Sequence, residues 1–96
     1  MTAFAHSPLF PLGEIVITRN ALQTLVPEDI LESLGRHARC DCGERSPDDP
    51  ADYEFAQKAC ASGGLLSIYR DRKGKKFWIF TERDRTATTV LLPEEY

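Results

Sequence analysis

The four consecutive residues Phe77–Phe80 (FWIF) constrain the fold of this 96-residue chain more than any other stretch. Successive residues of a strand point to opposite faces of a sheet. The first and third of these side chains therefore share one face, and the second and fourth share the other. A strand over Phe77–Thr81 is apolar on both faces, which is typical of a central strand that is covered on both sides.

Three further stretches predict strands, namely Glu14–Thr18, Leu65–Arg70 and Ala87–Leu92. The first is rich in β-branched residues, and the second alternates between two faces. Asp71–Gly74 and Glu82–Arg85 have the composition of turns. The last three strands are therefore expected to form a three-stranded antiparallel meander.

Helices are expected between the first strand and the meander. Thr18 or Asn20 can cap a short helix, and Pro27 suits the first turn of a second one. Asp49 can cap a third helix that ends at Gly63. The sequence thus predicts a single α+β domain over residues 1–96, with an N-terminal strand, two to three helices and the meander. We expect the helices to pack on one face of the sheet.

The totals restrict the class of protein. Twelve basic and fifteen acidic side chains give a net charge of −3, without the basic excess of a general nucleic-acid binder. No stretch approaches the roughly 20 apolar residues of a membrane span, and the N-terminal residues do not have the pattern of a signal peptide. We expect a cytoplasmic protein without a membrane partner, in which the three cysteines stay reduced. A chain this short has little room for a substrate cavity, which favours a binding protein over an enzyme.

Charge is distributed unevenly along the chain. From Glu28 to Glu54 nine acids face three arginines, whereas from Arg70 to Lys76 five bases face one acid. Such a dipolar pattern can steer a charged partner to one face, although it also suits two solvated surfaces. The acidic candidates for partner binding are Glu44, Asp48, Asp49, Asp52 and Glu54. The basic candidates, on a hairpin with interleaved aromatic residues, are Arg70, Arg72, Lys73, Lys75 and Lys76.

The segment Arg36–Gly43 (RHARCDCG) gathers chemically active side chains. His37, Cys40 and Cys42 are a set that zinc accepts, and a cysteine beside a histidine can form a nucleophilic pair. The segment lacks the repeated C-x2-4-C pairing of structural zinc sites, and no orienting group or oxyanion loop is recognisable. We therefore expect neither a metal nor a cofactor. His37 is expected half-buried at a helix end, where the helix dipole favours its protonated form.

Four stretches resemble a family of small bacterial proteins that are carried on plasmids, phages and genomic islands. They are Phe10–Thr18, Arg36–Gly43, Leu65–Tyr69 and Lys76–Tyr96. Members of that family are often labelled plasmid-related proteins or type I restriction endonuclease subunit M. Where the family reads G-D-W-G, this chain has Cys40-Asp41-Cys42-Gly43. The resemblance implies a mobile-element setting, and it implies no catalytic residues.

These observations favour a non-enzymatic interaction protein, with a counter-defence inhibitor as the leading hypothesis. Its partner would be a host defence complex, either a CRISPR effector or a restriction enzyme, and a homodimer is a further possibility. The first alternative is an accessory protein that binds nucleic acid directly through the basic hairpin. The second is a small metal-dependent enzyme that uses His37, Asp41, Glu82 and Asp84. A polar turn framework, which either shapes the fold or meets a partner, comprises Arg36, His37, Asp41, Glu82, Asp84 and Arg85.

Overall fold

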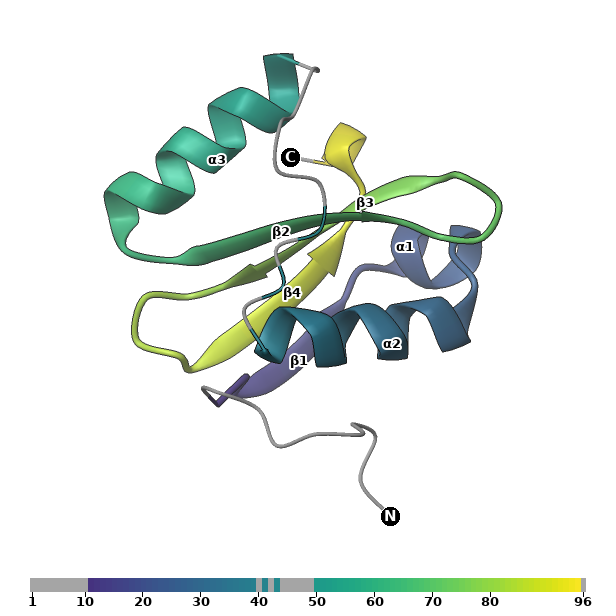
Figure 1. The fold of residues 1–96 in the computed structure, drawn as a ribbon, viewed down its shortest axis with the longest axis horizontal. Helices are drawn as coiled ribbons and strands as arrows, with labels where there is room; N and C mark the ends of the chain where they lie inside the picture. The colour runs from purple at the N-terminus through teal and green to yellow at the C-terminus, as the bar shows by residue number, and fades with distance from the viewer. Residues whose placement is uncertain (1–10, 40, 42, 44–49, 96) are drawn as a thin grey trace.

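The structure, a computed structural model, describes residues 11–39, 41, 43 and 50–95 (Figure 1). Within these ranges the chain forms three α-helices, four strands and a short 3-10 helix. In chain order they are β1 (Glu14–Ile17), α1 (Arg19–Thr24), α2 (Pro27–Ala38), α3 (Pro50–Ser62), β2 (Leu65–Arg70), β3 (Lys76–Thr81), β4 (Ala87–Leu91) and η1 (Pro93–Glu95). The α+β class that the sequence predicts is confirmed.

The strands form one mixed sheet in the order β1-β4-β3-β2. β2 pairs antiparallel with β3, and β3 pairs antiparallel with β4. β1 lies parallel to β4, with Glu14 opposite Ala87 and Ile17 opposite Val90. The last three strands pair antiparallel as predicted, but the sheet is a four-stranded mixed one and not a three-stranded antiparallel meander. β1 can run parallel to β4 because the connection between them is long and contains the three helices and two strands.

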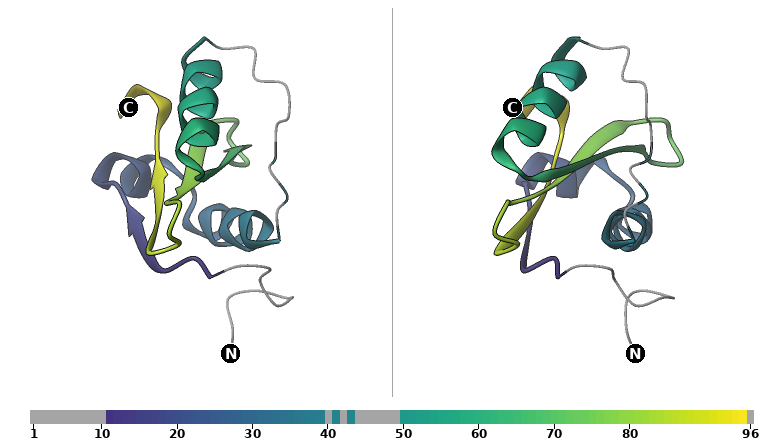
Figure 2. Two further views of the ribbon diagram at one scale, coloured as in Figure 1. Left: turned by 90° about the vertical axis from the view of Figure 1, so that its left-hand side faces the viewer. Right: turned by 60° about the vertical axis from the view of Figure 1, so that its left-hand side comes forward.

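Helices cover both faces of the sheet, in three layers. α1 and α2 lie on one side and α3 lies on the other (Figures 1 and 2). One buried cluster joins Ile30 and Leu34 of α2 to Phe77 and Ile79 of β3, and a second joins Phe55 of α3 to Trp78 and Phe80. The prediction that the helices pack on one face is wrong. The two-sided apolar strand, by contrast, is confirmed: Phe77, Trp78 and Ile79 have no exposed surface.

The start of each helix follows from local chemistry. Thr18 caps α1 by accepting a hydrogen bond from the Ala21 N–H at 3.2 Å. Pro27 occupies the first turn of α2, and Glu28 and Asp29 follow it at the positive end of the helix dipole. Pro50 begins α3. These starting positions agree with the sequence prediction, except that Asp49 lies outside the described residues.

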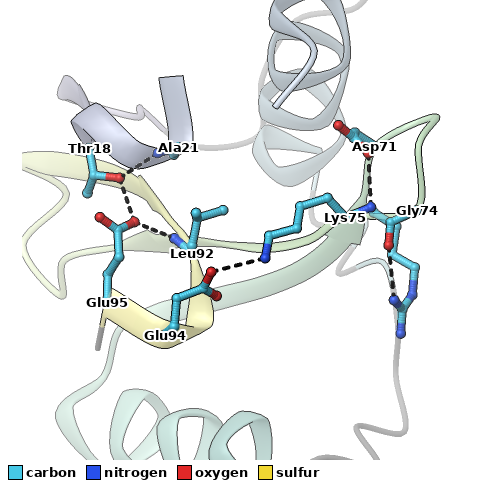
Figure 3. Close-up of polar contacts among 9 residues, drawn as sticks. Thr18, Ala21, Asp71, Gly74, Lys75, Leu92, Glu94 and Glu95 are labelled. Atoms are coloured by element: carbon cyan, nitrogen blue, oxygen red, sulfur yellow. Dashed lines mark hydrogen bonds and ion pairs between the residues drawn. The ribbon is translucent and has the colours of Figure 1, made fainter. Parts of the chain in front are cut away.

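The last turn of the chain holds the start of α1. The Glu95 carboxylate accepts a hydrogen bond from the Thr18 hydroxyl at 2.7 Å and another from the Leu92 N–H at 2.8 Å (Figure 3). The same hydroxyl oxygen accepts the bond from Ala21. One threonine therefore joins the N-terminal strand, the first helix and the last turn.

Two-sided coverage can be tested by shortening side chains on opposite faces of β3. Trp78→Ala and Ile79→Ala should each lower the free energy of unfolding by about 3 kcal/mol or more, because each leaves a cavity in a separate core. Urea unfolding followed by circular dichroism measures the change. Leu22→Ala, at a side chain that is 55% exposed, should change stability by no more than about 0.5 kcal/mol. A sheet covered on one face would tolerate one of the two β3 variants.

Candidate functional site

The segment Arg36–Gly43 runs from the end of α2 to the outer edge of β2. The Arg36 guanidinium holds the Asp41 carboxylate through two hydrogen bonds, of 2.8 and 3.2 Å. It also lies over the Tyr69 ring, 4.9 Å from the ring centroid. The Tyr69 hydroxyl donates to the Asp41 carbonyl. These contacts fix the turn after α2 against β2. The hydrogen bonds to the Asp41 carboxylate, chiefly that from Arg36 and secondly that from the Gly43 N–H, lower its pKa.

Gly43 closes this turn on the sheet. It forms a parallel bridge to Ile68, and its N–H donates to the Asp41 carboxylate at 3.2 Å. Its φ of +73° lies in the left-handed region, and a Cβ at this position would collide with the Ile68 carbonyl oxygen and the Tyr69 ring. Asp41 and Gly43, which we call the edge loop, therefore cover the outer edge of β2 at Ile68.

His37 points the other way, into the core. Its Nδ1 lies 2.6 Å from the Ser67 hydroxyl of β2, and its Nε2 lies 2.7 Å from the Thr81 hydroxyl of β3. Thr81 lies 2.8 Å from the Thr88 hydroxyl of β4, which donates to the Leu12 carbonyl at 2.6 Å. Four buried polar side chains therefore form one hydrogen-bonded chain between α2 and the sheet.

The directions of the three bonds from His37 to Leu12 follow from the last acceptor, and the direction of the Ser67 bond follows from the neutral state of the imidazole. A carbonyl only accepts, so the Thr88 proton goes to Leu12 and Thr88 must accept from Thr81. Thr81 has then used its proton and must accept from the Nε2–H of His37. In the neutral imidazole the other nitrogen is an acceptor, so Ser67 donates to Nδ1. His37 is the neutral Nε2–H tautomer.

The electrostatics of the core agree with this assignment. Burial, and secondly the positive charge of Arg85, lower the pKa of His37 from 6.5 to about 4. The expectation of a half-buried, protonated histidine is wrong, because the side chain turns inward and is only 2% exposed. With both ring nitrogens bonded to hydroxyl groups, His37 supports the packing of α2 on the sheet.

The basic hairpin is held by the protein's own acceptors. Arg72 binds the Asp29 carboxylate of α2 through both side-chain and backbone N–H groups, and Lys75 binds Glu94 at 3.0 Å (Figure 3). Lys73 donates to the Thr24 carbonyl, and Arg70 donates to the Gly74 carbonyl. These contacts orient the hairpin cations toward α2, the turn and η1.

Asp71 organises the tip of that hairpin. One carboxylate oxygen accepts from the N–H groups of Lys73 and Lys75, at 3.0 Å each, and the other accepts from the Val26 N–H at 3.2 Å. Asp71 is 5% exposed. A buried carboxylate needs such donors, and here they join the β2–β3 turn to the start of α2.

The acidic candidates are described only in part. Glu44, Asp48 and Asp49 lie outside the described residues, and of Asp52 only its place in α3 is given. Glu54 is exposed and pairs with Lys58 one helical turn later, at 3.2 Å. The predicted partner-binding role of this segment stays a prediction.

The turn Glu82–Arg85 forms a unit of its own. The Arg85 guanidinium donates to the carbonyls of Glu82 and Arg83, and the Asp84 carboxylate accepts from the N–H and hydroxyl of Thr86. The predicted polar framework therefore separates into three parts: Arg36 with Asp41 at the β2 edge, His37 in the core, and this turn. His37 approaches the turn through Thr81, the residue before Glu82, and through the charge of Arg85, which acts on its ring.

Shallow hollows on the described surface include two with polar linings. One, of about 210 Å³, lies between α2 and the hairpin and is lined by Asp29, Glu32, Ser33, Arg36, Arg70, Asp71 and Arg72. Its three arginines and three carboxylates balance. The other, of about 260 Å³, is lined by Glu82, Arg83 and Asp84.

The described ranges were also searched for metal and membrane features. They contain no group of three or more His, Cys, Asp or Glu side chains placed to hold a metal ion. None of their helices has the length and apolar character that crossing a membrane requires. Cys40 and Cys42 of the predicted metal set lie outside these ranges.

Comparison with known proteins gives no relative. No family model matches the chain, and neither a curated protein sequence nor a solved structure matches it. The resemblance to small plasmid- and phage-borne proteins therefore stays a prediction.

Sequence reasoning missed the partners of His37, although a signal was present. His37 follows Ile30 by seven residues and Leu34 by three, which places it on the apolar face of α2. Ser67, Thr81 and Thr88 occupy inward positions of their strands, where polar residues need a partner. A histidine on the apolar face of a helix needs polar partners in the core, and three inward hydroxyl groups on the sheet need them too. Together they predict hydrogen bonds between the helix and the sheet.

The neutral histidine predicts a pH dependence of stability. Unfolded His37 takes up a proton below about pH 6.5, whereas the folded protein does so only below about 4. The free energy of unfolding should therefore fall as the pH drops from 6.5 to 4, by roughly 3 kcal/mol in total. Urea unfolding at several pH values measures this loss. His37→Gln should remove most of it, and His6→Gln should keep it; equal slopes in both variants would contradict the assignment.

Gly43 offers a second test, with Gly74 as a matched control. Both glycines have positive φ, of +73° and +83°, but nothing lies within 4 Å of a Cβ at Gly74. Gly74→Ala should cost about 1 kcal/mol of stability through backbone strain alone. Gly43→Ala should cost clearly more, because the edge loop must also move away from β2. Thermal unfolding of the two variants gives the difference, and equal losses would show that the close approach is unimportant.

Proposed function

We propose that this protein is a non-enzymatic interaction protein of a mobile genetic element that inhibits a host nuclease complex, such as a CRISPR effector or a restriction enzyme. The observation that carries the proposal is the arrangement of charge. Arg72 and Lys75 of the basic hairpin are ion-paired with the protein's own carboxylates. The segment Glu44–Glu54 carries five acids and one arginine, for a net charge of −4. We infer from this sequence charge that a partner approaching the segment would meet carboxylates in excess.

The position of His37 also supports a binding role. The enzyme hypothesis needs this histidine as a metal ligand or as an acid–base group beside Asp41, Glu82 and Asp84. Both of its ring nitrogens are instead bonded to buried hydroxyl groups. A ligand or substrate would have to displace Ser67 or Thr81 from the core to reach it.

The mechanism we propose is competition with DNA. Nuclease complexes hold DNA in basic grooves, and carboxylates presented at phosphate-like spacing fit such grooves. Association driven by these charges is fast at low ionic strength and slows as salt screens them. The resemblance to plasmid- and phage-borne proteins supports this setting, since a mobile element gains from blocking a host nuclease.

The proposal predicts inhibition that depends on the acidic segment. The full chain, titrated into purified CRISPR or restriction complexes of its native host, should block DNA binding by one of them, measured by fluorescence anisotropy of labelled DNA. Changing Asp48, Asp49 and Asp52 to Asn and Glu54 to Gln should weaken inhibition by about tenfold or more, or roughly 1.4 kcal/mol. The salt dependence of inhibition should fall in the same variant.

A matched control removes the same charge elsewhere. Glu14, Glu28, Glu32 and Glu82 are exposed, and changing all four to Gln should leave inhibition within about twofold of the original. Two results would contradict the proposal. One is the lack of inhibition of any defence complex in the native host. The other is direct binding of the chain to DNA that is lost when Arg72, Lys73, Lys75 and Lys76 are neutralised, which would favour the nucleic-acid alternative.

A further inference from the structure

The two edges of the sheet differ. β2 ends the sheet on one side, and the edge loop covers it at Ile68. β1 ends the sheet on the other side (Figure 1), and in the described part of the chain no strand or bridge lies beyond it. Proteins usually cover or blunt a sheet edge, because its unpaired N–H and C=O groups bind another strand. Among residues 11–39, 41, 43 and 50–95, β1 is therefore the edge strand without a covering segment.

The outward groups of β1 can be identified from its pairing with β4. The N–H groups of Glu14 and Thr18 donate to the carbonyls of Thr86 and Val90, at 2.9 and 3.1 Å. Alternate residues of a strand direct their backbone groups to the same side. The N–H and C=O groups of Ile15 and Ile17 therefore point away from β4, toward the open edge.

The side chains at this edge are apolar on both faces of the sheet. Ile15 is 42% exposed and Val16 is 41% exposed, and the strand alternation places them on opposite faces. Exposed apolar groups on both sides of an unpaired edge are what a further strand would bury.

We propose that β1 pairs with β1 of a second copy of this chain, in an antiparallel arrangement about a two-fold axis at Val16. In this register Ile15 faces Ile17 of the second copy, and Ile17 faces Ile15. Both are residues whose backbone groups point outward, so each pair exchanges two hydrogen bonds. Val16 lies opposite Val16 between them.

The same register satisfies the remaining side chains of the strand. The four isoleucines gather on one face, and Glu14 lies opposite Thr18 of the second copy, so no carboxylates oppose each other. A register shifted to a two-fold axis at Ile15 would place Glu14 opposite Val16. It would also need Gly13 as a paired strand residue, but Gly13 has a φ of +67° and lies against the Thr86 backbone. The strand is therefore more complementary to itself about Val16 than about Ile15.

Sedimentation velocity of the full chain tests the pairing. An interface of one strand is small, so dimers should appear at concentrations on the order of 100 µM. Val16→Lys places like charges opposite each other at the axis and should raise the dissociation constant by about tenfold or more at low salt. Leu22→Lys and Leu31→Lys introduce the same charge at two exposed leucines outside β1 and should leave the dissociation constant unchanged. Circular dichroism of each variant checks that it is folded.

A cross-linking variant tests the register without introducing a charge. In a chain with Cys40, Cys42 and Cys60 changed to Ser, Val16→Cys should form a disulfide-linked dimer under mild oxidation, because facing residues of a non-hydrogen-bonded pair lie close together. Leu22→Cys in the same background should stay monomeric. A chain that is monomeric throughout this range overturns the proposal. So does a dimer that is insensitive to Val16→Lys, or an edge that pairs only with a strand of another protein. The test involves no nuclease, and its outcome is therefore separate from that of the proposed function.

Discussion

The buried hydrogen-bonded chain through His37 is the interaction on which the arrangement of the elements depends. It begins on β2, passes through α2, crosses β3 and β4, and ends at the backbone just before β1. If α2 moved away from the sheet, His37 would lose both of its partners, and Ser67 and Thr81 would each lose the hydrogen bond that they make to it. Apolar packing alone would allow α2 to slide along Phe77 and Ile79, whereas this chain has one arrangement in which every donor finds an acceptor.

A second group of polar contacts places the remaining segments around that core. Asp71 and Asp29 join the hairpin tip to the start of α2, and Glu95 joins the last turn to the start of α1. Surface ion pairs contribute little stability individually. Their effect here is directional, because they hold exposed cations against acceptors of the same chain. A partner would therefore meet mainly the charged side chains that are not already paired within the chain.

How far the sequence predicts this fold depends on the range of each signal. The two-sided strand Phe77–Phe80, the caps at Thr18 and Pro27, and the turn at Asp71 all rest on neighbouring residues, and all agree with the structure. The face of the sheet that each helix covers depends on the connections between helices and strands, and the spacing of apolar residues does not reveal these connections. The parallel place of β1 beside β4 also leaves no local signal. At the candidate site, the sequence predicts a turn that contains Arg36, Asp41 and Gly43, and the structure has one. The inward direction of His37 can be predicted only from its helical spacing to Ile30 and Leu34.

The pairing of β1 with β4 has a consequence for how the chain acquires its structure during synthesis. β1 is synthesised before the helices and the other strands of this sheet, and its only strand neighbour in the described structure is β4. The hairpin of β2 and β3 closes over a short loop, but β1 must wait for all the elements between it and β4 and then close a long loop, which is slow. Until β4 emerges, the Glu14–Ile17 segment remains an unpaired apolar strand. During that interval the segment is exposed to pairing with other chains, which is the stage at which unpaired strands aggregate.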